Sequence, residues 1–338
     1  MSGEHGAPVT VVGAGSWGTA LAIQYARTGR ETRMWGRETD EVAEMRELRE
    51  NPGYLPGATF PDDLHPEPDL AAALDGVSDV LIVVPSHGLR ETLVRVRTVA
   101  RQPLRVSWAT KGFELETGKL PHEVARDVLG EDVPVAVLSG PTFAKEVGAG
   151  LPTALTVASP DPAFAREIAE GISGDNFRAY TSGDMIGVEV GGAVKNVLAI
   201  GAGLSDGLGF GANTRIALIT RGLIEMTRLG VALGAEKETF TGLAGMGDLV
   251  LTCTDDQSRN RRMGLALAAG KTVAEAEAEI RQVVEGVLAA RAVWEKAQSL
   301  GIEMPITEQI YRIIYEGKSP QEAVTDLMRR ALKPENVI

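Results

Sequence analysis

The feature that most constrains this fold is a glycine-rich turn close to the N-terminus. A short apolar, β-branched run, Val9–Val12, is followed directly by Gly13-Ala14-Gly15-Ser16-Trp17-Gly18 and then by a helical pattern. A strand, a G-x-G-x-x-G turn and a helix in this order are typical of a dinucleotide-binding unit. Gly13 would allow the tight bend, Gly15 would let the backbone approach a pyrophosphate, and Gly18 would let the helix pack on the strand. We therefore expect a dinucleotide at this helix N-terminus, rather than a glycine turn without a ligand.

The residues after the second predicted strand bear on which dinucleotide is bound. Residues 31–35 are predicted to form this strand, and Gly36-Arg37-Glu38 follow it. An acidic residue at this place would bind the ribose 2′-hydroxyl of NAD, whereas an arginine would meet the 2′-phosphate of NADP. Arg37 therefore favours NADP(H). Glu38 beside it leaves NAD(H) open as an alternative.

Strand-like and helical runs alternate along the first half of the chain, up to about Tyr180. This alternation predicts a mostly parallel, doubly wound sheet. Further strands are predicted at 80–84, 104–109, 133–138 and 154–158, with helices at 89–100 and 162–172. Ligands of such sheets lie at the carboxyl ends of the strands. Lys111 follows one of these ends and is a candidate site residue.

The strand signal disappears after Asp184, and the apolar spacing becomes helical. Gly270, Gly301 and Gly317 are predicted C-terminal caps. Helices are predicted at 188–204, 213–233, 259–269, 272–279, 284–300, 307–316 and 319–328. The predicted fold is therefore α/β plus all-α. A Rossmann-type dinucleotide-binding domain, residues 1–185, precedes an all-helical substrate and catalytic domain, residues 186–338.

A lysine lies inside the most apolar of these predicted helices. Lys195 belongs to an uninterrupted small-residue and apolar run from Gly192 to Gly207, which continues to Asn213. An ammonium that loses its hydration has its pKa lowered toward neutrality, where it can exchange protons. Lys195 is therefore the first candidate for a general acid/base. The alternative is a lysine whose stem packs while its charged end reaches solvent.

A basic cluster in the second half is a candidate anion site. Ser258 is predicted to cap the helix that follows, which leaves Arg259 and Asn260 in its first turn, where the helix dipole favours an anion. Arginine binds phosphate with two parallel hydrogen bonds. Alternatively, the cluster is a solvated helix start that pairs with Asp255 and Asp256.

One carboxylate upstream lies in apolar, glycine-rich surroundings. The segment Gly242-Leu243-Ala244-Gly245-Met246-Gly247-Asp248-Leu249 is predicted to be a turn. Asp248 is either a buried cap or a carboxylate that binds a substrate hydroxyl and orients Lys195. One carboxylate, two lysines and an arginine-asparagine pair suit a small phosphorylated carbonyl compound.

Composition restricts the class of protein. With 338 residues the chain exceeds what one core usually supports, so two domains are expected. The net charge of −12 argues against nucleic acid as a partner. The single cysteine, Cys253, suits a reducing compartment and is expected to be a small buried hydrophobic residue. We expect no signal peptide, no apolar run long and charge-free enough to span a membrane, no metal site, and a cytoplasmic location.

These motifs together resemble the bacterial NAD(P)-dependent glycerol-3-phosphate dehydrogenases, in the family's order and over nearly the whole chain. The run around Lys195 is the most specific match. The others are Gly13 to Ala22, Trp108 to Glu114, Ser139 to Glu146, Gly245 to Asp248, Ser258 to Asn260 and Val283 to Gly286. The resemblance implies reversible hydride transfer between NAD(P)H and dihydroxyacetone phosphate. The product, sn-glycerol 3-phosphate, would supply phospholipid synthesis. The segment from Met1 to Pro8 has no counterpart and is expected to be disordered.

The resemblance also implies roles for individual residues. Lys195 would be the proton donor and acceptor, and Lys111 would touch both substrate and cofactor, so that Lys195, Lys111 and Asp248 form the catalytic set. Residues implied to contact the dinucleotide, besides the three glycines of the turn, are Ser16, Trp17, Arg37, Lys111, Ala144, Arg259, Val283 and Glu285. Residues implied to line the substrate are Lys111, Gly140, Thr142, Lys195, Asp248, Ser258, Arg259 and Asn260. A homodimer is also expected.

Three alternative interpretations stay open at this point. A ketopantoate-reductase-like or 6-phosphogluconate-dehydrogenase-like enzyme would share the cofactor domain, a helical domain and a catalytic lysine. Dependence of the rate on the substrate phosphate would separate these from the first interpretation. An NADP(H)-sensing regulatory protein would not need the set of Lys195, Lys111 and Asp248. A structural assembly protein would not explain the placement of the glycines.

Overall fold

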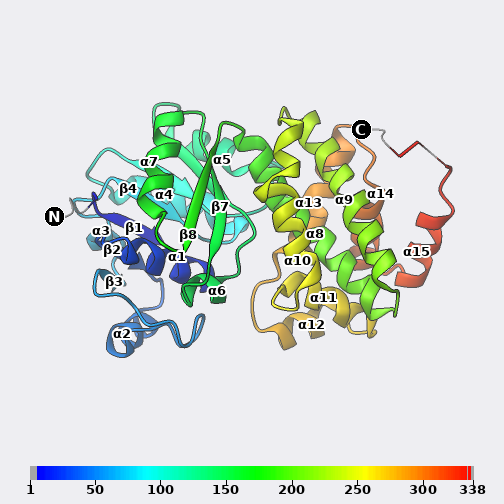
Figure 1. Cartoon of the computed structure of the whole chain (residues 1–338), viewed down its shortest axis with the longest axis horizontal. Helices are drawn as coiled ribbons and strands as arrows, with labels where there is room; N and C mark the ends of the chain where they lie inside the picture. Colours follow the sequence, from blue (N-terminus) through cyan, green and yellow to red (C-terminus); the bar gives the residue numbers. More distant parts are fainter. Residues whose placement is uncertain (1–5, 333, 336–338) are drawn as a thin grey trace. The chain divides into compact units, whose positions relative to one another are not determined.

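The computed structural model describes residues 6–332, 334 and 335, which form two compact units (Figure 1). Unit 1 takes the described residues up to Thr110 together with Pro121–Met185, and unit 2 takes Lys111–Leu120 and the described residues from Ile186 onward. The sequence-based boundary after residue 185 had placed 111–120 in the first domain. Residues 111–120 belong to the helical unit instead, because Phe113 and Leu120 are buried in the helical core.

The N-terminal expectation falls partly outside the described residues. Residues 1–5 of the segment that was expected to be disordered are not described. Within 6–8, the carbonyl of Ala7 accepts a hydrogen bond from Arg30 Nε. The chain is thus tied to the fold two residues before its first strand.

Unit 1 is built on a mainly parallel sheet that, within the described residues, has eight strands in the order β3-β2-β1-β4-β5-β6-β7-β8. Only the pair β6 and β7 is antiparallel among these neighbours. The strands are β1 Val9–Val12, β2 Thr32–Trp35, β3 Leu64–Glu67, β4 Asp79–Ile82, β5 Arg105–Trp108, β6 Val135–Ser139, β7 Thr153–Ala158 and β8 Phe177–Ser182. The prediction of a doubly wound, mostly parallel sheet is confirmed.

Helices cover both faces of this sheet (Figure 1). Helix α1 packs against α6 and α7, whereas α4 packs against α3 and α5. The helices are α1 Ser16–Arg27, α2 Thr39–Leu48, α3 Leu70–Ala73, α4 Leu89–Val99, α5 Pro121–Leu129, α6 Ala144–Gly148 and α7 Pro162–Ile172, with a short 3₁₀ turn, η1, at Ser86–Gly88. One core of this unit includes buried residues of β1, β6, β7, α1 and α7.

Unit 2 is helical, as predicted, and its segments surround the long helix α8 Met185–Gly207 (Figure 1). Glycines let its neighbours approach closely: a Cβ on Gly203 would lie 2.0 Å from the carbonyl oxygen of Arg261, and one on Gly191 would lie 2.4 Å from that of Ala244. The other elements are α9 Ala212–Ala232, η2 Lys237–Thr241, η3 Leu243–Gly247, α10 Asp248–Thr254, α11 Arg259–Ala268, α12 Val273–Ile280, α13 Glu285–Ser299, α14 Pro305–Tyr315 and α15 Pro320–Met328.

The helix ends of unit 2 follow the predicted capping chemistry. Gly270, Gly301 and Gly317 all have positive φ, at 86°, 66° and 68°, which is the left-handed conformation that a glycine C-cap adopts. Glu225 of α9 caps α14 from outside, because its carboxylate accepts hydrogen bonds from the backbone amides of Ile306 and Thr307. Burial raises the pKa of this carboxyl to about 7, against the effect of those bonds.

The expectation about apolar runs is corrected by α8. Among the described residues, this one helix is long and apolar enough to cross a membrane by length and composition. Of its most apolar window, 94% is buried inside the structure. Although Lys195 interrupts the run, the mean hydropathy of α8 is still as high as that of a membrane-spanning helix.

Candidate functional site

The glycine-rich turn between β1 and α1 has the geometry that its three glycines predict. Gly13 has φ of +121°, and a Cβ there would lie 2.3 Å from the carbonyl oxygen of Val83. A Cβ on Gly18 would lie 1.9 Å from the carbonyl oxygen of Gly13, so only glycine lets the helix approach its own turn. At Gly15, by contrast, a Cβ would meet no described atom within 4 Å. Two glycines therefore shape the turn, and the third leaves open space beside it.

The N-terminus of α1 fits an anionic dinucleotide. Gly15 is the N-cap, and no side chain of a described residue caps the helix. The first turn contains no acidic residue, so the amides and the helix dipole can favour a pyrophosphate. The indole Nε1 of Trp17 is buried without a hydrogen-bond partner among the described residues. The hydroxyl of Ser16 donates to the carbonyl of Tyr54, 2.7 Å away.

Arg37 lies two residues beyond β2, as predicted, and is paired with its neighbour. Its Nε is 2.8 Å from Glu38 Oε1, and the two side chains are 78% and 57% exposed. The hydrogen bond and the charge of Glu38 raise the pKa of this guanidinium. Arg37 and Glu38 thus form an exposed ion pair at the strand end where the ribose of a dinucleotide would lie.

The segment after β6 carries the other unit 1 residues that the resemblance implies. Gly140 packs against β7, since a Cβ there would lie 2.8 Å from Leu155 Cα. The Thr142 hydroxyl donates to the carbonyl of Gly140 at 3.2 Å. Ala144 begins α6, the short helix that packs on α1. These residues follow the carboxyl end of a strand, which is where ligands of such sheets bind.

Two lysines of unit 2 share one buried carboxylate. Lys195 Nζ lies 2.5 Å from Asp248 Oδ1, and Lys111 Nζ lies 2.7 Å from Asp248 Oδ2. The side chains of Lys195, Lys111 and Asp248 are 8%, 13% and 1% exposed. Lys195 is therefore desolvated, as predicted, and does not reach solvent with its charged end. The structure brings together the three residues that the sequence proposed as a catalytic set.

The electrostatics of this cluster favour proton exchange at Lys195. Burial, together with the charge of Lys111 and against the opposing charge of Asp248, lowers the pKa of Lys195 to about 8. Burial alone would raise the pKa of Asp248, but the two ammonium groups outweigh it and the net shift is downward. Asp248 is therefore a carboxylate, and Lys195 is the group closest to losing a proton at neutral pH.

Local structure around Asp248 differs from the predicted turn. Leu243–Gly247 forms a π-helical turn, η3, which continues into α10 with Asp248 as its first residue. π-Helical turns often occur at functional sites. The contact of η3 with Gly191 holds this carboxylate against α8. Glycine-rich composition had favoured a non-helical turn, whereas packing on α8 selects a helical one.

Thr252 is a site residue that the sequence interpretation missed. Its hydroxyl oxygen accepts a hydrogen bond from Lys195 Nζ at 3.0 Å and donates to the carbonyl of Asp248 at 2.6 Å. The signal was available, because residues four apart on a helix lie on the same face. Thr252 completes the polar surroundings of the Lys195 ammonium.

The start of α11 is fixed against α8 and α13 by an amide network. Ser258 caps α11, as predicted, by accepting a hydrogen bond from the amide of Arg261. Asn260 Nδ2 donates to Asn196 Oδ1 at 2.9 Å, and Asn260 Oδ1 accepts from the amide of Gly286 at 2.9 Å. Asn196 follows Lys195 directly, so the α11 start is connected to the lysine cluster through one neighbouring residue.

The two predicted roles of the basic cluster are divided between its arginines. Arg259 Nη1 donates to the carbonyl of Val283 at 3.0 Å, which joins it to the segment that contains Glu285. Arg261 instead forms ion pairs with Asp256 at 2.8 Å and with Asp206 at 2.5 Å. The alternative prediction, pairing with acidic residues, therefore holds for Arg261, whereas Arg259 makes no ion pair among the described residues.

Cys253 behaves as a buried hydrophobic residue, as expected. It is fully buried in the helical core, and burial raises the pKa of its thiol to about 12. A thiol of this kind is not a nucleophile near neutral pH.

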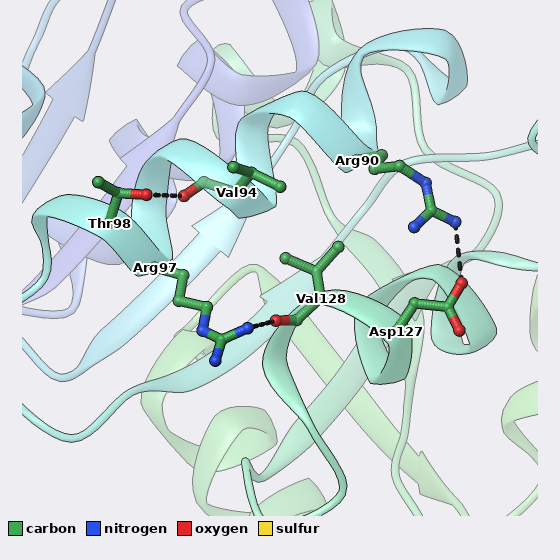
Figure 2. Close-up of a pocket in the computed structure, with 6 residues that line it drawn as sticks. All are labelled: Arg90, Val94, Arg97, Thr98, Asp127 and Val128. Atoms are coloured by element: carbon green, nitrogen blue, oxygen red, sulfur yellow. Dashed lines mark hydrogen bonds and ion pairs between the residues drawn. The ribbon is translucent and has the colours of Figure 1, made fainter.

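A hollow between α4 and α5 is lined by none of the predicted site residues (Figure 2). Two arginines of α4 bridge the helices there: Arg90 pairs with Asp127 at 3.0 Å, and Arg97 donates to the carbonyl of Val128 near the end of α5. Figure 2 shows both guanidinium groups directed at these partners. Arg97 thus serves as a C-terminal cap of α5, and the hollow has a structural explanation.

The fold and the two sets of residues define a dinucleotide-dependent oxidoreductase. Residues 8–169 match a sequence model of the NAD-dependent glycerol-3-phosphate dehydrogenase N-terminus, and residues 184–325 match that of its C-terminus. The chain belongs to the NAD-dependent glycerol-3-phosphate dehydrogenase family.

Individual relatives agree over nearly the full length. A glycerol-3-phosphate dehydrogenase (NAD(P)+) from Shewanella halifaxensis is 54% identical over 333 residues, which cover 98% of each chain. One from Photobacterium profundum is 56% identical over 328 residues, covering 97% of each chain. The crystal structure of glycerol-3-phosphate dehydrogenase from Coxiella burnetii has a TM-score of 0.93 and 50% identity, and covers 96% of this chain and 99% of its own.

Proposed function

We propose that this chain reversibly reduces dihydroxyacetone phosphate to sn-glycerol 3-phosphate with NAD(P)H and so supplies glycerophospholipid synthesis. The observation that carries the proposal is the buried cluster of Lys195, Asp248 and Lys111 in a chain of this family. Burying two ammonium groups against one carboxylate costs desolvation free energy. A role in proton transfer explains this cost, whereas a sensor or a structural protein does not require such a cluster.

The cluster supplies the acid that such a reduction needs. A bound nicotinamide provides the hydride, and its addition to the C2 carbonyl leaves an alkoxide. The Lys195 ammonium stabilises this charge and transfers its proton to the alkoxide oxygen, which gives the alcohol and a neutral amine. In the reverse direction the neutral amine takes the hydroxyl proton. Asp248 and Thr252 hold the Lys195 side chain in place through both steps.

The substrate phosphate is assigned to the start of α11. Ser258, Arg259 and Asn260 lie at a helix N-terminus, where amides and the dipole favour an anion. Asn260 donates one amide proton to Asn196, and its side-chain oxygen accepts a hydrogen bond from Gly286. Its second amide proton is therefore the one that we assign to the phosphate. Gly140 and Thr142, with Lys111, Lys195 and Asp248, are assigned to the remaining substrate atoms.

The cofactor site is assigned to the glycine-rich turn and the ion pair after β2. Gly13, Gly15, Ser16, Trp17 and Gly18 would bind the pyrophosphate region. Arg37 would bind the 2′-phosphate, so that NADP(H) is preferred and NAD(H) is still used. The further assignments to the dinucleotide are Lys111, Ala144, Arg259, Val283 and Glu285.

The setting of the enzyme is also a proposal. We infer a soluble, cytoplasmic homodimer without stable membrane insertion. One cysteine in 338 residues and burial of the most apolar helix support this setting.

An absorbance assay with NADPH tests the function. The wild-type protein should oxidise NADPH with dihydroxyacetone phosphate and do so poorly with dihydroxyacetone, because the phosphate site would be empty. Lys195→Met should lower the turnover rate by at least about 100-fold, the loss expected without the general acid, with NADPH binding nearly unchanged. Turnover above about a tenth of the wild-type value would overturn the assignment of Lys195.

Substitution of Arg37 tests the cofactor preference. Charge-assisted hydrogen bonds to the 2′-phosphate should favour NADPH over NADH by about 1 to 3 kcal/mol. Arg37→Asp should therefore abolish most NADPH use and preserve or improve NADH use, measured as kcat/KM for both cofactors. If both fall equally, Arg37 stacks on the adenine ring instead. The wild-type preference should also shrink as salt screens the contact.

A further inference from the structure

Unit 1 contains three buried polar atoms without a hydrogen-bond partner among the described residues. They are Trp17 Nε1, Tyr25 Oη and Ser139 Oγ. A buried polar group that makes no hydrogen bond is destabilising, so each such group needs an explanation. Trp17 belongs to the proposed cofactor turn, which leaves Tyr25 and Ser139.

Ser139 lies on the ligand-binding edge of the sheet. It is the last residue of β6 and is 3% exposed. The strand register joins Val12, Ile82, Trp108 and Val137 in one row across β1, β4, β5 and β6. Ser139 is two residues beyond this row, at the level of the glycine-rich turn that follows Val12. Its hydroxyl therefore lies at the carboxyl edge, where ligands of doubly wound sheets bind.

Tyr25 lies at the other end of the same unit. Its ring lies beneath the guanidinium of Arg30, 5.3 Å from the ring centroid, and Arg30 is paired with Asp79, the first residue of β4. The Tyr25 hydroxyl is thus near the amino edge of the sheet. Tyr25 and Ser139 are thus two buried hydroxyls that both lack a hydrogen-bond partner among the described residues. They differ in position, because Tyr25 is near the amino edge of the sheet and Ser139 is at the carboxyl edge.

The strand order indicates which half of the dinucleotide Ser139 would meet. The order reverses between β1 and β4, and a dinucleotide spans this point with its pyrophosphate at the β1 turn. Arg37, which the proposed function assigns to the adenosine ribose phosphate, follows β2 on one side of β1. Ser139 ends β6, three strands away on the opposite side. The nicotinamide half must extend toward that side.

We propose that the Ser139 hydroxyl binds the nicotinamide half of the dinucleotide through a hydrogen bond to its carboxamide. A hydroxyl both donates and accepts, and the carboxamide offers both an acceptor oxygen and a donor nitrogen. The bond fixes the rotation of the nicotinamide ring. This inference rests on the proposed function, because it requires that the turn after β1 binds NADP(H).

The test compares Ser139→Ala with Tyr25→Phe by calorimetric titration. The ligands are NADPH and 2′-phospho-ADP-ribose, which lacks the nicotinamide ring. Ser139→Ala should raise the Kd for NADPH by about 5- to 10-fold, as expected for one neutral hydrogen bond, and leave the Kd for 2′-phospho-ADP-ribose unchanged. The ligand-free Tm should not fall, because the hydroxyl has no partner to lose among the described residues. Tyr25→Phe should leave both Kd values unchanged.

Other outcomes overturn the inference in distinguishable ways. An unchanged Kd for NADPH in Ser139→Ala, with normal binding by the wild type, excludes the contact and leaves the proposed function intact. Equal weakening for both ligands shows damage to the turn, and a change confined to KM for dihydroxyacetone phosphate assigns Ser139 to the substrate. If Ser139→Ala fails to fold, Ser139→Cys keeps the volume and should show the same selective weakening. Failure of the wild type to bind NADPH would reject the proposed function itself.

Discussion

At the residue scale, the centre of the helical unit is one carboxylate between two ammonium groups. Asp248 is 1% exposed and can neutralise only one of Lys111 and Lys195. The cluster therefore carries a net positive charge in a desolvated place, and the pKa of one lysine must fall. Lys195 is the more buried of the two, which explains why the shift is found there.

This charge balance predicts the pH dependence of the reaction. In the proposed mechanism, oxidation of glycerol 3-phosphate needs the neutral amine of Lys195, so kcat/KM should rise with pH through about 8, the pKa of this lysine in the free protein. Reduction needs the ammonium and should fall over the same range. Because Lys111 lowers the pKa of Lys195, Lys111→Met should move the inflection to higher pH, at a lower overall rate. Profiles recorded from pH 7 to 10 check this, and an inflection that stays in place would show that Lys111 does not set the acidity of Lys195.

The sequence could identify the charged site residues but not all of their contacts. Lys195 was recognisable as a candidate because a lysine in an apolar helix is desolvated unless its charged end reaches solvent. Ser258 was recognisable because serine is favoured as the N-cap of a helix. The bond between Lys111 and Asp248 joins residues 137 positions apart. Only tertiary packing brings these together. Asn260 shows the same limit, since its partners are set by the close approach of α8, α11 and α13.

At the scale of elements, α8 organises the helical unit because its glycines let other elements touch its backbone. Gly203 faces the carbonyl oxygen of Arg261, and a Cβ on Gly264 of α11 would lie 2.0 Å from that of Ile200. These contacts fix α11, which starts with the residues assigned to the substrate phosphate. The fit of the two backbones thus determines where the proposed phosphate site lies relative to Lys195.

Gly203→Ala tests this role of α8. Alanine favours a helix over glycine by about 1 kcal/mol, but here its Cβ would lie 2.0 Å from backbone that cannot move aside cheaply. Overpacking costs about 1–3 kcal/mol, so the free energy of unfolding in denaturant should fall, and KM for dihydroxyacetone phosphate should rise as α11 shifts. Gly183→Ala, where a Cβ meets no described atom within 4 Å, is the control and should change stability by less than about 0.5 kcal/mol. A stabilised Gly203→Ala protein would contradict the close packing.

Among the elements, the inner strands and the long helices of unit 2 were predictable, whereas the edge strands and the helical segment around Asp248 were not. β1, β4, β5 and β6 are short and largely buried, and the periodicity of α7 gave its bounds without error. β3 contains Pro66 and only an edge strand tolerates it, so its sequence does not predict a strand. β8, at the other edge, has only one buried residue and lacks the apolar run of the inner strands. Pairing with a neighbour, rather than local preference, makes both of them strands.

At the scale of the whole molecule, the two units have separate hydrophobic cores among the described residues. One buried cluster belongs to the sheet unit and another to the helical unit. The proposed dinucleotide turn is built on the first, and the lysine cluster lies in the second. A net charge of −12 means that anionic ligands need local donors. The donors that we propose are the α1 N-terminus in the sheet unit and the start of α11 in the helical unit.

Two cores predict two unfolding transitions, which we expect calorimetry to resolve. NADPH at 100 times its Kd should stabilise the structure that binds it by about 2.7 kcal/mol. Because the proposed pyrophosphate turn lies in the sheet unit, we expect NADPH to raise mainly the transition of that unit. Ile23→Ala in the sheet core and Leu198→Ala in the helical core each remove a fully buried side chain, at a cost of about 2–5 kcal/mol. Ile23→Ala should lower the transition that NADPH raises, and Leu198→Ala should lower the other. A single transition that both substitutions lower, and that NADPH raises as a whole, would show that the two cores unfold as one cooperative structure.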